Sequence, residues 1–169
     1  MATSSANWIY LGNLAEIDTD ESDFDNENGN AILGTYDSED LQIVNVTGDD
    51  ADNGGNIHAD DNGGVAENLS YDVGAGTVTS PLDAEAIYNA TVVTDAGTST
   101  MTFIIIQVQN GDVFAITNAL NDAVIHSIQL TSVSSDNYFG ITAPIANSGN
   151  TTNSSIVCFV AGTLIATPH

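Results

Sequence analysis

The 169-residue chain contains 23 Asp and Glu residues, three His and no Lys or Arg, so its formal net charge at pH 7 is −23. Proteins neutralise phosphates with Lys and Arg, and this composition therefore excludes the usual ways of binding nucleic acid or anionic membrane surfaces. Hydrophobic residues make up 42% of the chain and its mean hydropathy is +0.04, which is enough apolar material for a folded core. The length predicts a single domain.

So many carboxylates without a side-chain cation oppose a compact state, because folding brings like charges together. Their charge can be neutralised by bound cations or screened by a salty medium, and the two are compatible. Calcium is the expected cation, since it prefers the carboxylate, amide and backbone oxygens that are abundant here. The sequence therefore predicts calcium as a cofactor.

Along the chain, the strongest pattern is the period-2 alternation of β-strands, in segments rich in Val, Ile, Thr, Tyr and Phe. These segments are residues 43–47, 86–94, 98–109, 113–117 and 124–133. Short helical turns are expected at residues 14–17, 37–41 and 81–86. The predicted fold is an all-β single domain, an antiparallel β-sandwich or jelly-roll-like fold with long acidic loops.

Tight turns connect three of the predicted strands. Residues 95–97 read Asp-Ala-Gly and residues 110–112 read Asn-Gly-Asp, and both are typical of hairpin turns. Residues 86–117 are thus predicted to form a three-stranded meander. Residues 103–106 are apolar on both sides of their strand, which predicts a central strand with both faces covered.

Two polar segments between the predicted strands hold most of the acidic residues. In residues 18–30 acidic residues occur at alternate positions, a pattern that resembles a calcium-binding loop, although the spacing is not that of an EF-hand. Residues 48–64 repeat an Asp-Asn-Gly-Gly turn at 52–55 and 61–64, and two such turns can direct oxygens at one ion. The alternative is a mobile loop whose Asp and Gly serve only turns and solubility. The predicted metal ligands are Asp18, Asp20, Asp23, Asp25, Asp49, Asp50, Asp52, Asp60 and Asp61.

Few other residues point to chemistry. His58 lies in the second polar segment, where it is either a transition-metal ligand beside Asp60 or Asp61 or an incidental neighbour of them. His126 alternates with apolar residues in a predicted strand and is expected to face solvent. The sequence contains no Gly-x-Ser-x-Gly, His-Glu-x-x-His, P-loop or dinucleotide-binding motif.

The first residues lack the positive region and the apolar stretch of a secretory signal peptide. No apolar run approaches the roughly 20 residues of a membrane span. The single cysteine, Cys158, excludes an internal disulfide. We expect an extracellular protein that is exported without a Sec-type signal peptide.

The C-terminal residues carry the most specific motif. Residues 158–169 read Cys-Phe-Val-Ala-Gly-Thr-Leu-Ile-Ala-Thr-Pro-His, a stretch that resembles the opening block of the Hint (hedgehog/intein) superfamily. The upstream chain is similar to the acidic passenger regions that precede Hint domains in secreted bacterial proteins. The resemblance implies that Cys158 is a nucleophile that attacks the carbonyl of Val157 to form a thioester. The blocks that supply the acid and the cleavage do not follow, so Cys158 alone is not expected to process the chain.

The C-terminal segment also has a purely physical interpretation. Residues 156–169 are almost entirely apolar or β-branched, and such a segment must be buried. It can dock as the last strand of its own sheet, or it can add to the sheet edge of a neighbouring copy and build a filament by strand complementation. The predicted organisation is an acidic β-sandwich domain at 1–146, a flexible linker at 147–155 and an apolar C-terminal strand at 156–169.

From these features we predict an extracellular, calcium-stabilised structural or adhesive protein that assembles into a filament through its C-terminal strand. Its predicted partner is a second copy of the chain, and neither nucleic acid nor a membrane is expected as a partner. The alternative is the passenger and first fragment of a self-cleaving Hint-like protein, with Cys158 as the autoprocessing nucleophile.

Overall fold

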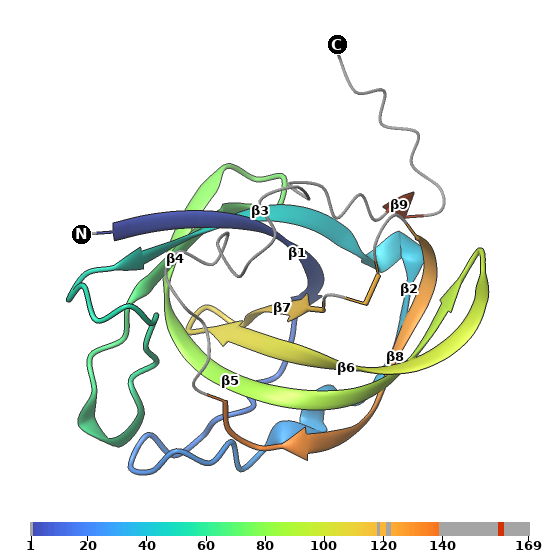
Figure 1. The fold of residues 1–169 in the computed structure, drawn as a ribbon. Coiled ribbons are helices and arrows are strands. Elements are labelled where there is room, and N and C mark those ends of the chain that lie inside the picture. The colour runs from blue at the N-terminus through green and yellow to red at the C-terminus, as the bar shows by residue number, and fades with distance from the viewer. Residues whose placement is uncertain (1, 118, 121–122, 139–158, 161–169) are drawn as a thin grey trace.

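The computed structural model describes residues 2–117, 119–120, 123–138 and 159–160 (Figure 1). Their strands are β1 (Ala2–Asn13), β2 (Gly34–Asp37), β3 (Gln42–Asp50), β4 (Asn68–Asp72), β5 (Thr77–Thr94), β6 (Gly97–Val108), β7 (Asp112–Ile116), β8 (Val124–Ser135) and β9 (Phe159–Val160). The helical elements within these ranges are the 3-10 turns η1 (Gly29–Ile32), η2 (Ser38–Asp40) and η3 (Asp61–Gly63). The predicted all-β class is confirmed. No helix in these ranges has the length and apolar character needed to cross a membrane.

All the strands belong to one sheet, in the order β2-β8-β5-β4-β3-β1-β7-β6. The first residues of β5 pair with β4, and the rest of β5 pairs with β6 on its other edge, so the sheet curls round and closes on itself (Figure 1). Neighbours among β1 to β8 are antiparallel, whereas β9 pairs with β8 in parallel. A closed sheet leaves few edges open to other chains.

Strands β5, β6 and β7 form the meander that the sequence predicts. Thr94 and Gly97 close the β5–β6 hairpin, and Gly111 lies between β6 and β7 with a φ of 93°, a left-handed value that glycine adopts without strain. β6 lies between β5 and β7. Phe103 and Ile105 pack on one of its faces and Ile106 on the other, which confirms a central strand covered on both sides.

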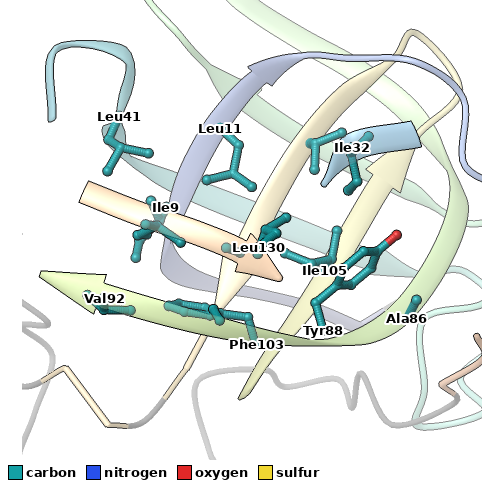
Figure 2. Packing of buried hydrophobic residues seen from close by; sticks show 14 of the residues in the cluster. Ile9, Leu11, Ile32, Leu41, Ala86, Tyr88, Val92, Phe103, Ile105 and Leu130 are labelled. Atoms are coloured by element: carbon teal, nitrogen blue, oxygen red, sulfur yellow. The ribbon is translucent and has the colours of Figure 1, made fainter. Parts of the chain in front are cut away.

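Two apolar clusters cover the two faces of the curled sheet, and β1 contributes alternate residues to each. Figure 2 shows Ile9 and Leu11 of β1 in the first cluster with Phe103 and Leu130 from the opposite side of the curl. Trp8 of β1 points into the second cluster, where its ring meets that of Phe114 edge to face at 5.9 Å between centroids. Successive side chains of β1 point to opposite faces of the sheet, so this one strand contributes to both clusters.

A bulge in β5 changes the direction of its side chains. Leu82 pairs with Val108 and Ala84 with Gln107, which leaves Asp83 as an extra residue without a partner on β6. Leu82 belongs to the second cluster, whereas Ala84 belongs to the first. The bulge thus switches the core face of β5 and turns Asp83 away from the regular ladder.

Two of the three expected helical turns are wrong. Residues 81–86 are extended, because they form ladder hydrogen bonds within β5, and residues 14–17 have no helical turn in the structure. The turn expected at residues 37–41 is present as η2. Strands β1 to β8 lie within residues 2–135, inside the domain predicted at 1–146, while the predicted linker and Cys158 fall outside the described residues.

Truncation of a core side chain tests the packing of the central strand. Phe103→Ala is expected to lower the free energy of unfolding by about 3–5 kcal/mol, because the ring is buried and its removal leaves a cavity. Urea unfolding at a fixed calcium concentration measures the change. The exposed neighbour Thr102 is the control, and Thr102→Ala should change the free energy by about 0.5 kcal/mol or less. Equal losses in the two variants would contradict this packing.

Candidate metal centre

Two acidic loops meet at one end of the sheet. Acidic loop 1 (residues 14–33) connects β1 to β2, and acidic loop 2 (residues 51–67) connects β3 to β4. The amide of Asn62 in loop 2 donates a hydrogen bond of 2.8 Å to the carbonyl of Glu21 in loop 1. Figure 1 shows both loops at the lower left of the view. Segments that lie about 40 residues apart in the sequence are thus neighbours in space.

A buried glutamine of β6 fixes the start of loop 1. Gln107 accepts a hydrogen bond from the amide of Ile17 at 2.8 Å and donates one to the carbonyl of Ala15 at 3.0 Å. The Ile17 side chain is fully buried in the first apolar cluster. These contacts hold Glu16 and Asp18, the neighbours of Ile17, at the edge of the core.

Strand β5 fixes the later part of loop 1. The Tyr88 hydroxyl donates a hydrogen bond of 2.7 Å to the carbonyl of Gly29, and the side-chain amide of Asn26 donates one of 3.1 Å to the carbonyl of Glu85. Both contacts are buried. Loop 1 is therefore tied to the sheet at both ends of its acidic stretch.

Loop 2 is organised around Glu67, which is buried. Its carboxylate accepts hydrogen bonds from the amides of Ala51 at 2.7 Å and His58 at 3.1 Å. Asp60 of the same loop accepts a hydrogen bond of 2.6 Å from the side-chain amide of Gln109, which follows β6. Backbone amides of loop 2 thus bind the Glu67 carboxylate, and Asp60 connects the loop to the end of β6.

The two loops and β5 bring carboxylates together in two sets. Asp18, Glu21 and Asp61 form the first set, and Glu16, Glu21 and Asp83 form the second. Within each set, one oxygen of each residue lies within 4.8 Å of the others. Two oxygens on opposite sides of a calcium ion are about 5 Å apart, so either set fits round one ion. The chain has no Lys or Arg that could pair with them.

Several of these carboxylates are buried. Asp18 is only 1% exposed, Asp83 is 6% exposed and Glu85, two residues further along β5, is 7% exposed. In the described part of the chain, the buried carboxylate oxygens of this end of the sheet without a hydrogen-bond partner are Glu21 Oε2, Asp60 Oδ1, Asp61 Oδ1 and Glu85 Oε1. A buried, unpaired carboxylate is costly, so each of them favours a proton or a bound cation.

The pKa values at this end of the sheet are displaced upward, mainly by burial. Burial raises the pKa of Asp18 to about 8 and that of Glu85 to about 9. Burial, together with the negative charge of Asp60, raises the pKa of Glu21 to about 7 and that of Asp83 to about 7. A cation that replaces these protons would remove the mutual repulsion of the ionised carboxylates.

The nine ligands predicted from the sequence are dispersed. Asp18 and Asp61 lie in the first set, and Asp60 lies close enough to act on Glu21 and Asp83. The others belong to neither set, and most of them form turns. Backbone amides a few residues later in the chain donate hydrogen bonds to the carboxylates of Asp20, Asp23, Asp50 and Asp52. The Asn137 side chain donates one to Asp25. Asp49 lies on β3.

The repeated Asp-Asn-Gly-Gly turns share a backbone conformation. Asn53 and Asn62 both adopt left-handed φ values, 59° and 52°. Their preceding aspartates nevertheless belong to different groups, since Asp61 lies in the first set whereas Asp52 lies near His58 and Glu67. The two turns therefore do not direct their aspartates at one site, and this prediction is wrong.

The group that contains His58 has less need of a cation. Asp52, His58 and Glu67 each place one atom within 4.8 Å of the others. The Glu67 carboxylate, however, is already engaged by backbone amides, and Asp52 accepts a hydrogen bond of 2.6 Å from the amide of Gly54. These carboxylates are satisfied by the protein itself. A cavity of about 460 Å³ lies beside them, lined in part by Phe24, His58, Asp61 and Glu85.

Sequence reasoning missed Glu16, Glu21, Asp83 and Glu85. Glu21 lies within the first polar segment, but only its contact with loop 2 reveals its place in both sets. Asp83 and Glu85 fall in a stretch that was expected to be a helical turn. Their signal in the sequence is two acids at alternate positions in an otherwise apolar run, which is unusual for a buried strand.

No family model, no curated protein and no solved structure matches this chain. Its function is therefore inferred from the chemistry of the two loops and of β5.

The raised pKa values predict how stability depends on pH. After divalent cations are removed, the midpoint of thermal unfolding should be higher at pH 5.5 than at pH 8.5. The folded-state pKa values of Asp18, Glu21, Asp83 and Glu85 lie above the unfolded values of about 4, so the stability linked to their protons is full below about pH 4 and is lost as the pH rises through 7 to 9. Circular dichroism melts at constant ionic strength measure the effect.

Matched variants identify the groups responsible. Glu85→Gln should flatten the upper part of the pH profile, because it removes the group with a pKa of about 9. Glu39→Gln removes the same charge from an exposed site in η2 and should leave the profile unchanged. A midpoint that rises from pH 5.5 to pH 8.5 in the metal-free wild-type chain would contradict the raised pKa values.

Proposed function

We propose that the chain is a calcium-stabilised β domain with a structural or adhesive role outside the cell, in which calcium links the two acidic loops to each other. The observation that carries the proposal is the convergence of Asp18, Glu21 and Asp61 within 4.8 Å, in a chain that has no Lys or Arg to pair with them. Asp18 is almost fully buried, and Glu21 and Asp61 each have a buried oxygen without a hydrogen-bond partner. A divalent cation satisfies all three.

Calcium fits the donor atoms better than other metals. The first set offers carboxylate oxygens only, and neither His nor Cys takes part, which disfavours zinc and copper. Magnesium demands near-ideal octahedral geometry at 2.0–2.1 Å and keeps most of its waters, whereas calcium accepts six to eight oxygens in irregular arrangements. The ligands here come from two loops of irregular backbone, which suits calcium.

The proposed extracellular role follows from calcium availability. Extracellular modules bind calcium with dissociation constants of about 10⁻⁴–10⁻³ M, and such sites fill only where calcium is abundant. A domain whose loops depend on the ion would be ordered outside the cell. The large negative charge supports the same environment, because salt and divalent cations reduce its repulsion.

Calcium removal tests this function. At a calcium concentration about a hundred times its dissociation constant, binding should stabilise the fold by about 2.7 kcal/mol and raise the melting temperature by roughly 5–10 °C relative to EDTA. Asp61→Asn should lose most of this increase, because it removes one ligand of the first set. Asp20→Asn is the matched control, since Asp20 is exposed in the same region and lies in neither set. An identical melting temperature in calcium and in EDTA would remove calcium from the account.

The proposed assembly uses the edge of β8. β2 pairs with β8 from Ser127 to Leu130, and the neighbouring residues Val124 and Ile125 pair with Phe159 and Val160 of the same chain. The C-terminal strand of a neighbouring copy would find the same hydrogen-bonding groups at this edge. We propose that this exchange builds the filament.

Deletion of residues 156–169 tests the assembly. The full chain in calcium should form filaments that are visible in electron micrographs, and the truncated chain should remain a folded monomer by light scattering, with an unchanged calcium-induced rise in melting temperature. Polymers that persist after the deletion, or a full chain that stays monomeric, would reject strand exchange.

The motif at Cys158 supports a second candidate function, that of passenger and first fragment of a self-cleaving Hint-like protein. Mixing the chain with a Hint remainder and dithiothreitol should then release a fragment that ends at Val157, detected by mass spectrometry. A Cys158→Ala chain is the control. No release from the wild-type chain would reject this function.

A further inference from the structure

We propose that the metal centre is binuclear, with two calcium ions that share Glu21. Asp18 and Asp61 would complete the first ion's carboxylate ligands, and Glu16 and Asp83 would complete the second's. This inference rests on the proposed calcium-binding function and adds a second site, which ties loop 1 to β5.

The geometry separates the two sites. Glu21 is the one residue common to the two sets, and each set keeps its own three oxygens within 4.8 Å of one another. A carboxylate has two oxygens, so one glutamate can contribute to two calcium ions at the usual distances of 2.3–2.6 Å. Glu21 lies in the middle of loop 1, where the amide of Asn62 holds its carbonyl at 2.8 Å.

Asp83 is the independent observation that points to a second ion. It is 6% exposed, and its carboxylate is directed at those of Glu16 and Glu21. Among the described residues, no group donates a hydrogen bond to it, and the charges that act on it are all negative. The β5 bulge places it there, because a regular strand would carry residue 83 in the ladder opposite β6. A buried carboxylate in these surroundings calls for a cation, and the chain has no Lys or Arg to supply one.

The charge balance also favours two ions. Glu16, Asp18, Glu21, Asp61 and Asp83 carry five formal negative charges when ionised. One calcium ion in the first set would leave Glu16 and Asp83 facing each other unneutralised, whereas two ions bring the centre close to neutrality. Asp60 lies beside both sites with one buried, unpaired oxygen, and it adds a further negative charge.

Each ion would have a different mechanical role. The first set joins loop 1, through Asp18 and Glu21, to loop 2, through Asp61. The second set joins loop 1, through Glu16 and Glu21, to Asp83 of β5. Of the two ions, only the second therefore connects loop 1 to the sheet.

Calcium stoichiometry tests the binuclear centre. The metal-stripped 169-residue chain is titrated with calcium alone, by isothermal titration calorimetry and by equilibrium dialysis. We expect two ions per wild-type chain, one in Asp83→Asn, one in Asp18→Asn, and affinity at least about tenfold weaker at both sites in Glu21→Gln, because ligand charge sets calcium affinity. The control Asp20→Asn should bind two. Glu16→Gln changes an exposed residue of the second set and should bind one ion even if Asp83→Asn folds poorly.

The outcomes separate this inference from the function on which it rests. One ion in the wild-type chain, with no change in Asp83→Asn and Glu16→Gln, would overturn the second site and leave the calcium-stabilised domain intact. Two ions in all of these variants would overturn the assignment of ligands. No bound calcium in the wild-type chain would overturn both proposals. In the absence of metal, Asp83→Asn should melt at a higher temperature than the wild-type chain, because it removes a buried charge, and a lower temperature would contradict the repulsion on which the second site is based.

Discussion

Carboxylates from three segments converge at one end of the sheet, and the chain has no Lys or Arg to offset their charge. This constraint governs the rest of the structure. Elsewhere apolar clusters cover the sheet, and antiparallel pairing closes it. The largest electrostatic cost of folding therefore arises at the acidic end. Protons relieve that cost at low pH, and bound cations would relieve it at neutral pH. The raised pKa values of Asp18 and Glu85 have the same cause, because burial disfavours the ionised form of each carboxylate.

The sheet positions the acidic residues through a few buried polar contacts. Gln107 fixes the backbone on both sides of Glu16, Tyr88 anchors the later part of loop 1, and the bulge in β5 turns Asp83 out of the ladder. Each contact starts from a strand that packs in the core. The carboxylates are therefore held by rigid elements even though their own segments are loops, and rigidity of this kind is what a cation site requires.

The fold was easier to predict than the site. The turns at residues 95–97 and 110–112 and the apolar run at 103–106 are local signals, and they correctly placed β5, β6 and β7. Asp18 and Asp61 are among the predicted ligands because acidic, glycine-rich segments suggest cation loops, and the structure brings these two together. Which acids meet depends on contacts between distant residues, such as the one between Asn62 and Glu21, and these leave no local pattern. The bulge that directs Asp83 is equally invisible, because it arises from the pairing of β5 with β6.

The long strand β5 has a consequence for how the molecule bears tension. Its last residue, Thr94, lies opposite Ile125 of β8, and Ile125 pairs on its other edge with Val160 of β9. At the opposite end, β5 carries Asp83. A pull on the C-terminal segment would thus enter the sheet at β8 and pass in shear to the same strand whose far end holds the acidic loops. A force that distorts β5 would then also displace Asp83, so stretching the chain would weaken the binding of calcium at that end.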